Sequence, residues 1–154
     1  MSAPAVMRLR RVRLVEVVRE GEDDGARVAG PGDAGALLRA VLPTDREGFA
    51  VVHLNGRHRV IGCELVSVGS LNASIVHPRE VFKGALLANA SSIILGHNHP
   101  SGDPDPSEED LGITLRLEQA GEVLGLSVLD HVIIAGERSM SFSASGLLTR
   151  GRAL

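Results

Sequence analysis

Residues 89–110 read NASSIILGHNHPSGDPDPSEED, a segment that combines an apolar run, two histidines and the start of a helix. The apolar run at residues 93–95 predicts a buried strand, which ends in His97 and His99 just before a loop rich in Pro and Gly. Side chains two residues apart in a strand point the same way, at a spacing of roughly 6–7 Å. His97 and His99 are therefore a geometrically sensible pair of metal ligands.

A helix begins at the end of the same segment and adds a carboxylate. The prolines and Gly102 prevent regular structure until residues 106–110. Apolar residues then recur every three or four positions, which predicts a helix with one face toward the core: Ile113, Leu117, Ala120 and Leu124. Asp110 lies on this face in the first turn, so we expect it to point toward the histidines. Ser107 and Asp110 also have the spacing of a capping box, and capping is compatible with metal binding.

Two histidines and one aspartate are the protein ligands of a catalytic zinc site in which water takes the fourth position. A lone histidine at a strand end is more often a packed or surface residue. A His-x-His pair followed by a proline-punctuated loop and a helix-start aspartate is much harder to explain by packing. We therefore interpret His97, His99 and Asp110 as the ligands of one Zn²⁺ per chain. His53 and His58 have no partner at ligand spacing, and we interpret both as non-functional.

The remaining elements predict an α/β class fold of the α+β type. Two strands at residues 49–54 and 59–68 are expected to form a hairpin across Asn55-Gly56 at the centre of the sheet. A further strand is expected at residues 126–134 after a helix stop at Gly125, and a short one within residues 139–148. Helices are expected at residues 34–42, capped by Asp33 and stopped by Pro43, and at residues 78–90, with these side chains available for packing: Val81, Phe82, Ala85, Leu86 and Ala88. The result is a mixed, mostly antiparallel sheet flanked by helices.

Length and composition predict one globular domain, because 154 residues with 44% apolar and 23% charged residues suffice for a single core. We expect residues 1–32 to form an N-terminal strand and a flexible connection, and residues 33–154 to form the metal-binding domain. The strand has a basic face, which is either a phosphate-binding arm or a solvated edge: Arg8, Arg10, Arg11 and Arg13. A formal net charge of −3 argues against a general affinity for nucleic acid.

The expected location is the cytoplasm. Cys63 is the only cysteine, which excludes an internal disulfide and fits a reducing compartment. The sequence shows neither an export signal nor a run of about 18 or more apolar residues, so no membrane partner is expected.

The segment His97-Asn98-His99-Pro100-Ser101-Gly102, with Pro106-Ser107 and Asp110, resembles the JAMM metalloprotease motif of JAB/MPN domains in the form carried by the bacterial RadC family. Residues 76–80 and 129–133 also resemble RadC segments, and the resemblance covers roughly residues 33–149. It implies the JAB/MPN (cytidine-deaminase-like) fold and a zinc hydrolase of the peptidase or isopeptidase type. It further implies Glu47 as the general base and Ser107 as a donor to the oxyanion. Glu64, on the neighbouring predicted strand, is the main rival for the base.

Three functions follow from these observations. The first is a zinc-dependent peptidase or isopeptidase that acts on a peptide or protein, supported by the complete set of motif residues. The second is a DNA-associated factor, supported by the family name and the N-terminal arginines, although the helical N-terminal region that RadC-type proteins carry has no room here. The third is a silent scaffold, against which the retained motif speaks. Asp130-His131 resembles a further family feature, for which the orientation of a ligand imidazole is one open role.

Overall fold

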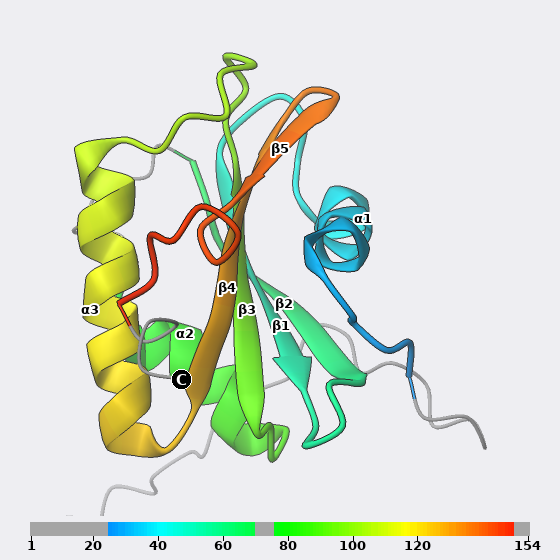
Figure 1. The fold of residues 1–154 in the computed structure, drawn as a ribbon, viewed down its shortest axis with the longest axis vertical. Coiled ribbons are helices and arrows are strands. Elements are labelled where there is room, and N and C mark those ends of the chain that lie inside the picture. Colours follow the sequence, from blue (N-terminus) through cyan, green and yellow to red (C-terminus); the bar gives the residue numbers. More distant parts are fainter. Residues whose placement is uncertain (1–24, 70–75, 150–154) are drawn as a thin grey trace, which may run out of the picture.

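The computed structural model describes residues 25–69 and 76–149, which form three helices and one five-stranded sheet (Figure 1). The strand order is β2-β1-β3-β4-β5. The strands are β1 (Gly48–Leu54), β2 (Val60–Val68), β3 (Ser92–Asn98), β4 (Ser127–Ala135) and β5 (Arg138–Ser141). Only β3 and β4 run parallel, and the other three neighbouring pairs are antiparallel. The predicted mixed, mostly antiparallel sheet is confirmed.

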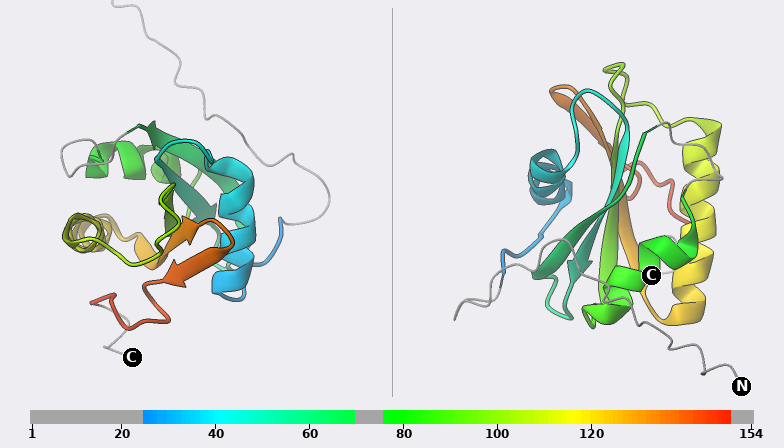
Figure 2. Two further views of the ribbon diagram at one scale, coloured as in Figure 1. Left: turned by 90° about the horizontal axis from the view of Figure 1, so that it is seen from above. Right: turned by 180° about the vertical axis from the view of Figure 1, so that it is seen from behind.

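Helices cover both faces of this sheet. The helix α1 (Pro31–Val41) packs on one face, while α2 (Pro78–Leu87) and α3 (Glu108–Leu124) pack on the other (Figure 1, Figure 2). Every residue of β1 and of β3 is buried. Burial on both faces explains why residues 93–95 are continuously apolar instead of alternating with polar residues. The histidines therefore extend from a strand that is buried along its whole length.

The ends of α3 follow the sequence signals closely. Ser107 is the N-cap, and its hydroxyl accepts from the backbone N–H of Asp110 while the Asp110 carboxylate accepts from the N–H of Ser107. Gly125 ends the helix in the left-handed region, with φ 72°. The predicted capping box and glycine stop are both confirmed. The capping box fixes the direction of the Asp110 side chain at the first turn.

The predicted start of the first helix is wrong by three residues. We expected Asp33 to cap a helix that begins at residue 34, but α1 begins at Pro31, whose fixed φ favours the first helical turn. Asp33 lies inside this turn, where its carboxylate accepts from the backbone N–H of Ala29 at 2.9 Å. The carboxylate thus satisfies a donor that precedes the helix instead of one within it.

The hairpin of β1 and β2 is confirmed, but its turn and its place in the sheet differ from the prediction. The left-handed residue is His58, with φ 58°, while the Asn55 side chain accepts from the N–H groups of Arg57 and Arg59. An asparagine that bonds to backbone N–H groups ahead of it stabilises a longer loop than a two-residue turn. β2 is an edge strand and β3 is the central one, so the expectation that the hairpin forms the centre is wrong.

Most predicted core positions are buried, Ala88 and Ala120 are partly buried, and the two exposed positions lie at helix ends. Val81, Phe82 and Ala85 are buried as expected, whereas Leu86 and Leu124 are 50% and 45% exposed. Both leucines belong to the last turns of their helices, and α2 ends at Leu87 instead of residue 90. Glu118 is buried instead, because its carboxylate accepts from the backbone N–H and the hydroxyl of Thr149.

Two other expectations concern the parts of the chain around this core. The basic strand predicted at residues 7–20 lies outside the described residues. Within residues 25–69 and 76–149, none of the helices has the length and apolar character that crossing a bilayer requires.

Candidate metal centre

The end of β3 fixes both histidines on one side of the sheet. His97 pairs with Phe49 on β1 and with Ile133 on β4, and its side chain is almost completely buried. His99 follows the strand, and its backbone N–H still donates to the carbonyl of Ile134 at 2.8 Å. This last bond keeps the backbone extended through His99, so the two imidazoles project to the same side, as the two-residue spacing predicts.

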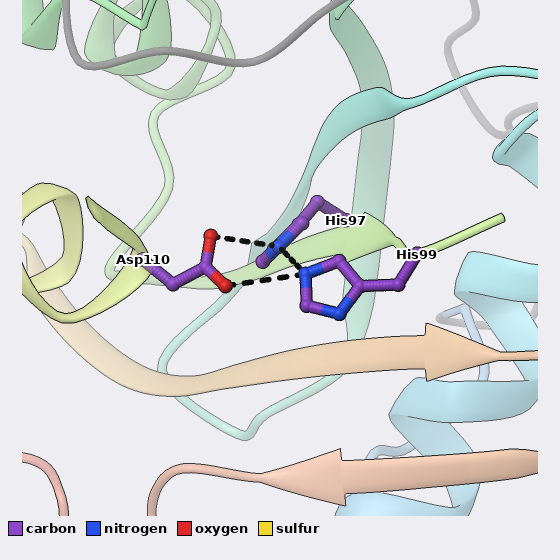
Figure 3. Close-up of side chains that lie close together, drawn as sticks. All are labelled: His97, His99 and Asp110. Carbon is purple, nitrogen blue, oxygen red and sulfur yellow. Dashed lines mark hydrogen bonds and ion pairs between the residues drawn. The ribbon is translucent and has the colours of Figure 1, made fainter. Parts of the chain in front are cut away.

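Asp110 completes a three-residue cluster (Figure 3). The Nε2 atoms of His97 and His99 lie 2.9 Å apart. Each also lies 3.1 Å from one carboxylate oxygen of Asp110, His97 from Oδ1 and His99 from Oδ2. One ligand atom from each residue lies within 4.8 Å of the others, a spacing that suits a single metal ion. The three side chains that the sequence singles out are therefore brought together by β3 and α3, while their role as ligands remains a prediction.

The hydrogen bonds on the far side of each ring favour a cation at this point. His99 Nδ1 lies 2.7 Å from the backbone carbonyl oxygen of Asp103, which only accepts, so this nitrogen carries the proton. An uncharged His99 therefore turns an unprotonated Nε2 toward His97 and the carboxylate. Acceptor atoms that face one another at about 3 Å repel unless a proton or a metal ion lies between them. The donor set of two imidazole nitrogens and one carboxylate oxygen fits zinc.

The pKa values of the cluster show how strongly its groups interact. The hydrogen bond to Asp110 raises the pKa of His99 above its usual value, although burial opposes this. Burial alone would raise the pKa of the Asp110 carboxyl, but its interactions with His97, His99 and the N–H of Ser107 together outweigh burial and hold this pKa well below its usual range. Asp110 is therefore an anion at neutral pH, as a metal ligand must be.

Glu47 lies at the same cavity, directly before β1. Its backbone carbonyl accepts from the N–H of Gly69 at 2.8 Å. Asn98, the residue between the two histidines, points to the opposite side and holds this segment with three hydrogen bonds. Its amide nitrogen donates to the carbonyls of Pro43 and Arg46, and its oxygen accepts from the N–H of Gly48. Asn98 thus ties the segment that carries Glu47 to the strand that carries the histidines.

A polar cavity of about 340 Å³ contains the cluster together with both predicted catalytic residues, Glu47 and Ser107. Ser107 is exposed, and because its hydroxyl accepts from Asp110, it keeps its own hydrogen for another partner. A second cavity, of about 230 Å³ and mostly apolar, adjoins the site through His99 and Pro100. The arrangement offers a cation site, a carboxylate and a hydroxyl around one space.

Glu64 lies away from this cavity. It is on β2 beneath α2. Its Oε2 lies so close to the backbone of Gly84 that a Cβ added to this glycine would be only 2.1 Å from it. Burial raises the pKa of Glu64, and its charged neighbours are Lys83 and Glu80. His53 lies against the same glycine, and burial lowers its pKa to about 4. The geometry thus favours Glu47 over Glu64 as the carboxylate near the cluster.

The Asp130-His131 pair divides into two separate contacts. His131 Nε2 lies 2.8 Å from His97 Nδ1, and His131 Nδ1 lies 2.6 Å from the hydroxyl of Thr114 on α3. Complete burial lowers the pKa of His131 well below its usual value, so the ring is uncharged at neutral pH. Asp130 points elsewhere and accepts from its neighbour's N–H, from the Ser141 hydroxyl and from the N–H of Ser143.

The contributions of Asn98 and Thr114 were not predicted from the sequence. The alternation of side chains along β3 places Asn98 on the face opposite the histidines, but its partners at residues 43–48 are distant in sequence. Thr114 lies one turn after Asp110 on α3, a spacing that marks a shared helix face without identifying a partner on β4.

The sheet, the helices on both faces and the His-His-Asp cluster together define a domain of the JAB/MPN fold class with a candidate metal site. The family model described as RadC-like JAB domain matches residues 28–147. This chain therefore belongs to the RadC-like JAB domain family.

Curated relatives agree with this assignment. The UPF0758 protein of Moorella thermoacetica is 53% identical over 115 residues, which cover 75% of this chain and 50% of that protein. The UPF0758 protein of Caldanaerobacter subterraneus is 54% identical over 110 residues, or 71% of this chain and 47% of that protein. The UPF0758 protein of Methanosarcina acetivorans is 44% identical over 128 residues, or 82% of this chain and 56% of that protein. The chain thus spans about half the length of the curated relatives that it matches.

Proposed function

We propose that this domain is a zinc-dependent hydrolase that cleaves amide bonds in a peptide or protein, as a peptidase or an isopeptidase. The observation that carries the proposal is the convergence of three acceptor atoms, from His97, His99 and Asp110, in a cavity that Glu47 also lines. A set of two nitrogens and one oxygen leaves a fourth tetrahedral position for a reactant, whereas structural zinc sites are closed by four protein ligands.

The two histidines and Asp110 would hold the ion. Zinc bound there would supply a water with a pKa near 7 and would polarise the scissile carbonyl. Nitrogen and oxygen donors without a thiolate also suit other divalent transition metals, so metal availability contributes to the choice of ion. Zinc is the ion that the donor set and the proposed hydrolysis favour together.

Glu47 and Ser107 would do the proton transfer and the charge stabilisation. Glu47 is half-buried beside the cluster, where its carboxylate would accept a proton from the attacking water and return it to the leaving amine. Proton transfer of this kind is typically worth about 10²–10⁴-fold in rate. The Ser107 hydroxyl would donate to the developing oxyanion, and a single such donor is worth about 10²–10³-fold. The apolar cavity beyond His99 would take a side chain of the substrate next to the cleaved bond.

The test is cleavage profiling of the zinc-loaded protein against peptide libraries and a cell lysate. Glu47→Gln should keep zinc and lose about 10²–10⁴-fold in turnover. Glu64→Gln is the matched control, because this carboxylate lies beneath α2, and its turnover should stay near wild type. Full turnover of Glu47→Gln, or loss of turnover only in Glu64→Gln, would contradict the assignment of the base.

A role in DNA binding is the alternative that the sequence leaves open. The arginines that would carry it, at residues 8–13, lie outside the described residues. This role is tested by titrating the same protein with duplex DNA at several salt concentrations. Binding through phosphate contacts should weaken steeply as the salt concentration rises.

A further inference from the structure

We propose that Thr114 and His131 are positioning residues that fix the tautomer of His97, so that His97 turns an unprotonated Nε2 toward the metal site. This inference rests on the metal binding proposed above and adds two residues to it, neither of which is a ligand. It is carried by a chain of three short contacts that runs from α3 through β4 to β3.

The first link fixes the hydroxyl hydrogen. Thr114 Oγ1 lies 2.7 Å from the backbone carbonyl oxygen of Asp110 and 2.6 Å from His131 Nδ1. The carbonyl has no hydrogen, so the hydroxyl must donate to it, and a hydroxyl has only one hydrogen to give. The contact with His131 then requires that Nδ1 of His131 donates to the hydroxyl oxygen.

The second link relates the tautomer of His131 to the tautomer of the proposed ligand His97. An uncharged imidazole has one donor and one acceptor nitrogen, so a His131 that donates from Nδ1 accepts at Nε2. The partner of Nε2 is His97 Nδ1, at 2.8 Å, which must therefore carry the proton. The remaining nitrogen of His97, Nε2, is left unprotonated and faces His99 and Asp110. The direction of one threonine hydroxyl thus decides which nitrogen of His97 is available to a metal ion.

The two histidines reach the same state by different means. His99 is fixed by the backbone carbonyl of Asp103, which cannot change its role. His97 is buried in the sheet, and its tautomer is fixed only by side chains, Thr114 and His131. The donor and acceptor roles of these side chains can be exchanged. A reversed chain would place a proton on His97 Nε2, and that proton would have to leave before a metal ion could bind. Residues that fix a ligand in this way typically change metal affinity by about 10–100-fold when they are replaced.

A simpler role for His131 is packing, and the structure allows the two roles to be separated. The His131 ring is fully buried, stacks on Phe142 with a centroid distance of 4.6 Å and forms a T-shaped pair with Phe49 at a centroid distance of 5.6 Å. His131→Phe keeps the aromatic packing and removes both nitrogens. His131→Gln loses the ring but has an amide oxygen that reaches about as far as Nε2 and accepts from His97. The packing role and the positioning role therefore predict opposite orders for these two variants.

The experiment measures zinc affinity of the full chain by competition with a chromophoric chelator. Positioning predicts that His131→Phe loses about 10–100-fold in affinity and that His131→Gln stays closer to wild type. Thr114→Val, which keeps the shape and removes the hydroxyl, should also lose affinity, whereas Thr114→Ser should retain it. An His131→Phe protein with wild-type affinity, or a Gln variant weaker than the Phe variant, would overturn the inference.

A second measurement tests the tautomer without metal or substrate. In ¹⁵N-histidine-labelled, metal-free protein at mildly alkaline pH, long-range ¹H–¹⁵N spectra distinguish protonated from unprotonated ring nitrogens. We expect His97 to be protonated at Nδ1 in the wild type and in Thr114→Ser, and to lose this preference in Thr114→Val. A wild-type His97 protonated at Nε2 would overturn the inference even if zinc binds. A correct tautomer together with absent zinc binding would instead overturn the proposed function alone.

Discussion

Replacing Asp110 with asparagine should separate the metal-binding role of this residue from its capping role. The carboxylate makes two kinds of contact: Oδ2 accepts from the N–H of Ser107, and both oxygens face the histidine nitrogens. An asparagine keeps one oxygen, which can still accept from Ser107. Its NH₂ group then faces His97 Nε2, to which it can donate. In the metal-free protein, an amide hydrogen would thus lie where two acceptor atoms otherwise face each other. The substitution at the same time removes the anionic metal ligand.

The expected stabilities follow from these contacts. Without metal, Asp110→Asn should unfold within about 1 kcal/mol of wild type, because each lost hydrogen bond is replaced by another of similar strength. Asp110→Ala leaves the N–H of Ser107 without this acceptor and should cost about 1–3 kcal/mol. With free zinc at about 100 times its dissociation constant, wild type should gain about 2.7 kcal/mol. That gain corresponds to a rise in Tm of roughly 5–11 °C for a chain of this size.

The assay is calorimetric unfolding of the three proteins with chelator and with zinc. Wild type should show the zinc-dependent rise in Tm, whereas Asp110→Asn should lose it and keep a wild-type Tm in chelator. If Asp110→Asn retains the full zinc-dependent rise, Asp110 is not a ligand. If the metal-free Asn variant is destabilised by about 3 kcal/mol or more, the contacts described for the carboxylate are wrong.

Three further predictions concern the cluster and its surroundings. Because the pKa of His99 is raised in the folded state, mainly by its hydrogen bond to Asp110, its stabilising contribution should be complete below about pH 6.5 and lost as pH rises through the folded pKa. Denaturant titrations of the metal-free protein should show this decline, and His99→Gln should lack it. Gly96→Ala places a Cβ 2.3 Å from the buried Leu38 side chain and should lower the free energy of unfolding by about 1–3 kcal/mol, and an unchanged urea midpoint would contradict it. Asn98→Ala removes three hydrogen bonds to the segment that carries Glu47 and should reduce turnover more than zinc affinity, whereas an equal loss of both would show that it acts on the ligands instead.

The part of the fold that sequence patterns could predict is the part that is local. The apolar run before His97, the capping box at Ser107 and the glycine stop at Gly125 each depend on neighbouring residues, and all three appear in the structure. The strand order depends on pairing between distant segments, which no local pattern specifies. The prediction that the hairpin forms the centre therefore failed, because β2 is at an edge. Local sequence patterns indicate whether a segment forms a helix or a strand, whereas the strands that pair with it depend on packing of the whole core.

The candidate site shows the same division. The histidine spacing and the helix-start aspartate could be read from the sequence, because each geometry is set within a few residues. The contacts of Asn98 with residues 43–48 and of Thr114 with His131 could not, because each joins two elements whose proximity is known only from the fold. The side chains that hold the site together are thus harder to predict than those that face its cavity.

The most direct test of the metal site is anomalous diffraction at the zinc edge from crystals of the zinc-loaded protein. We predict one anomalous peak among His97 Nε2, His99 Nε2 and the Asp110 carboxylate, with ligand distances of roughly 2.0–2.2 Å. A crystal without a peak at this position, or with its zinc bound by other residues, would contradict this prediction.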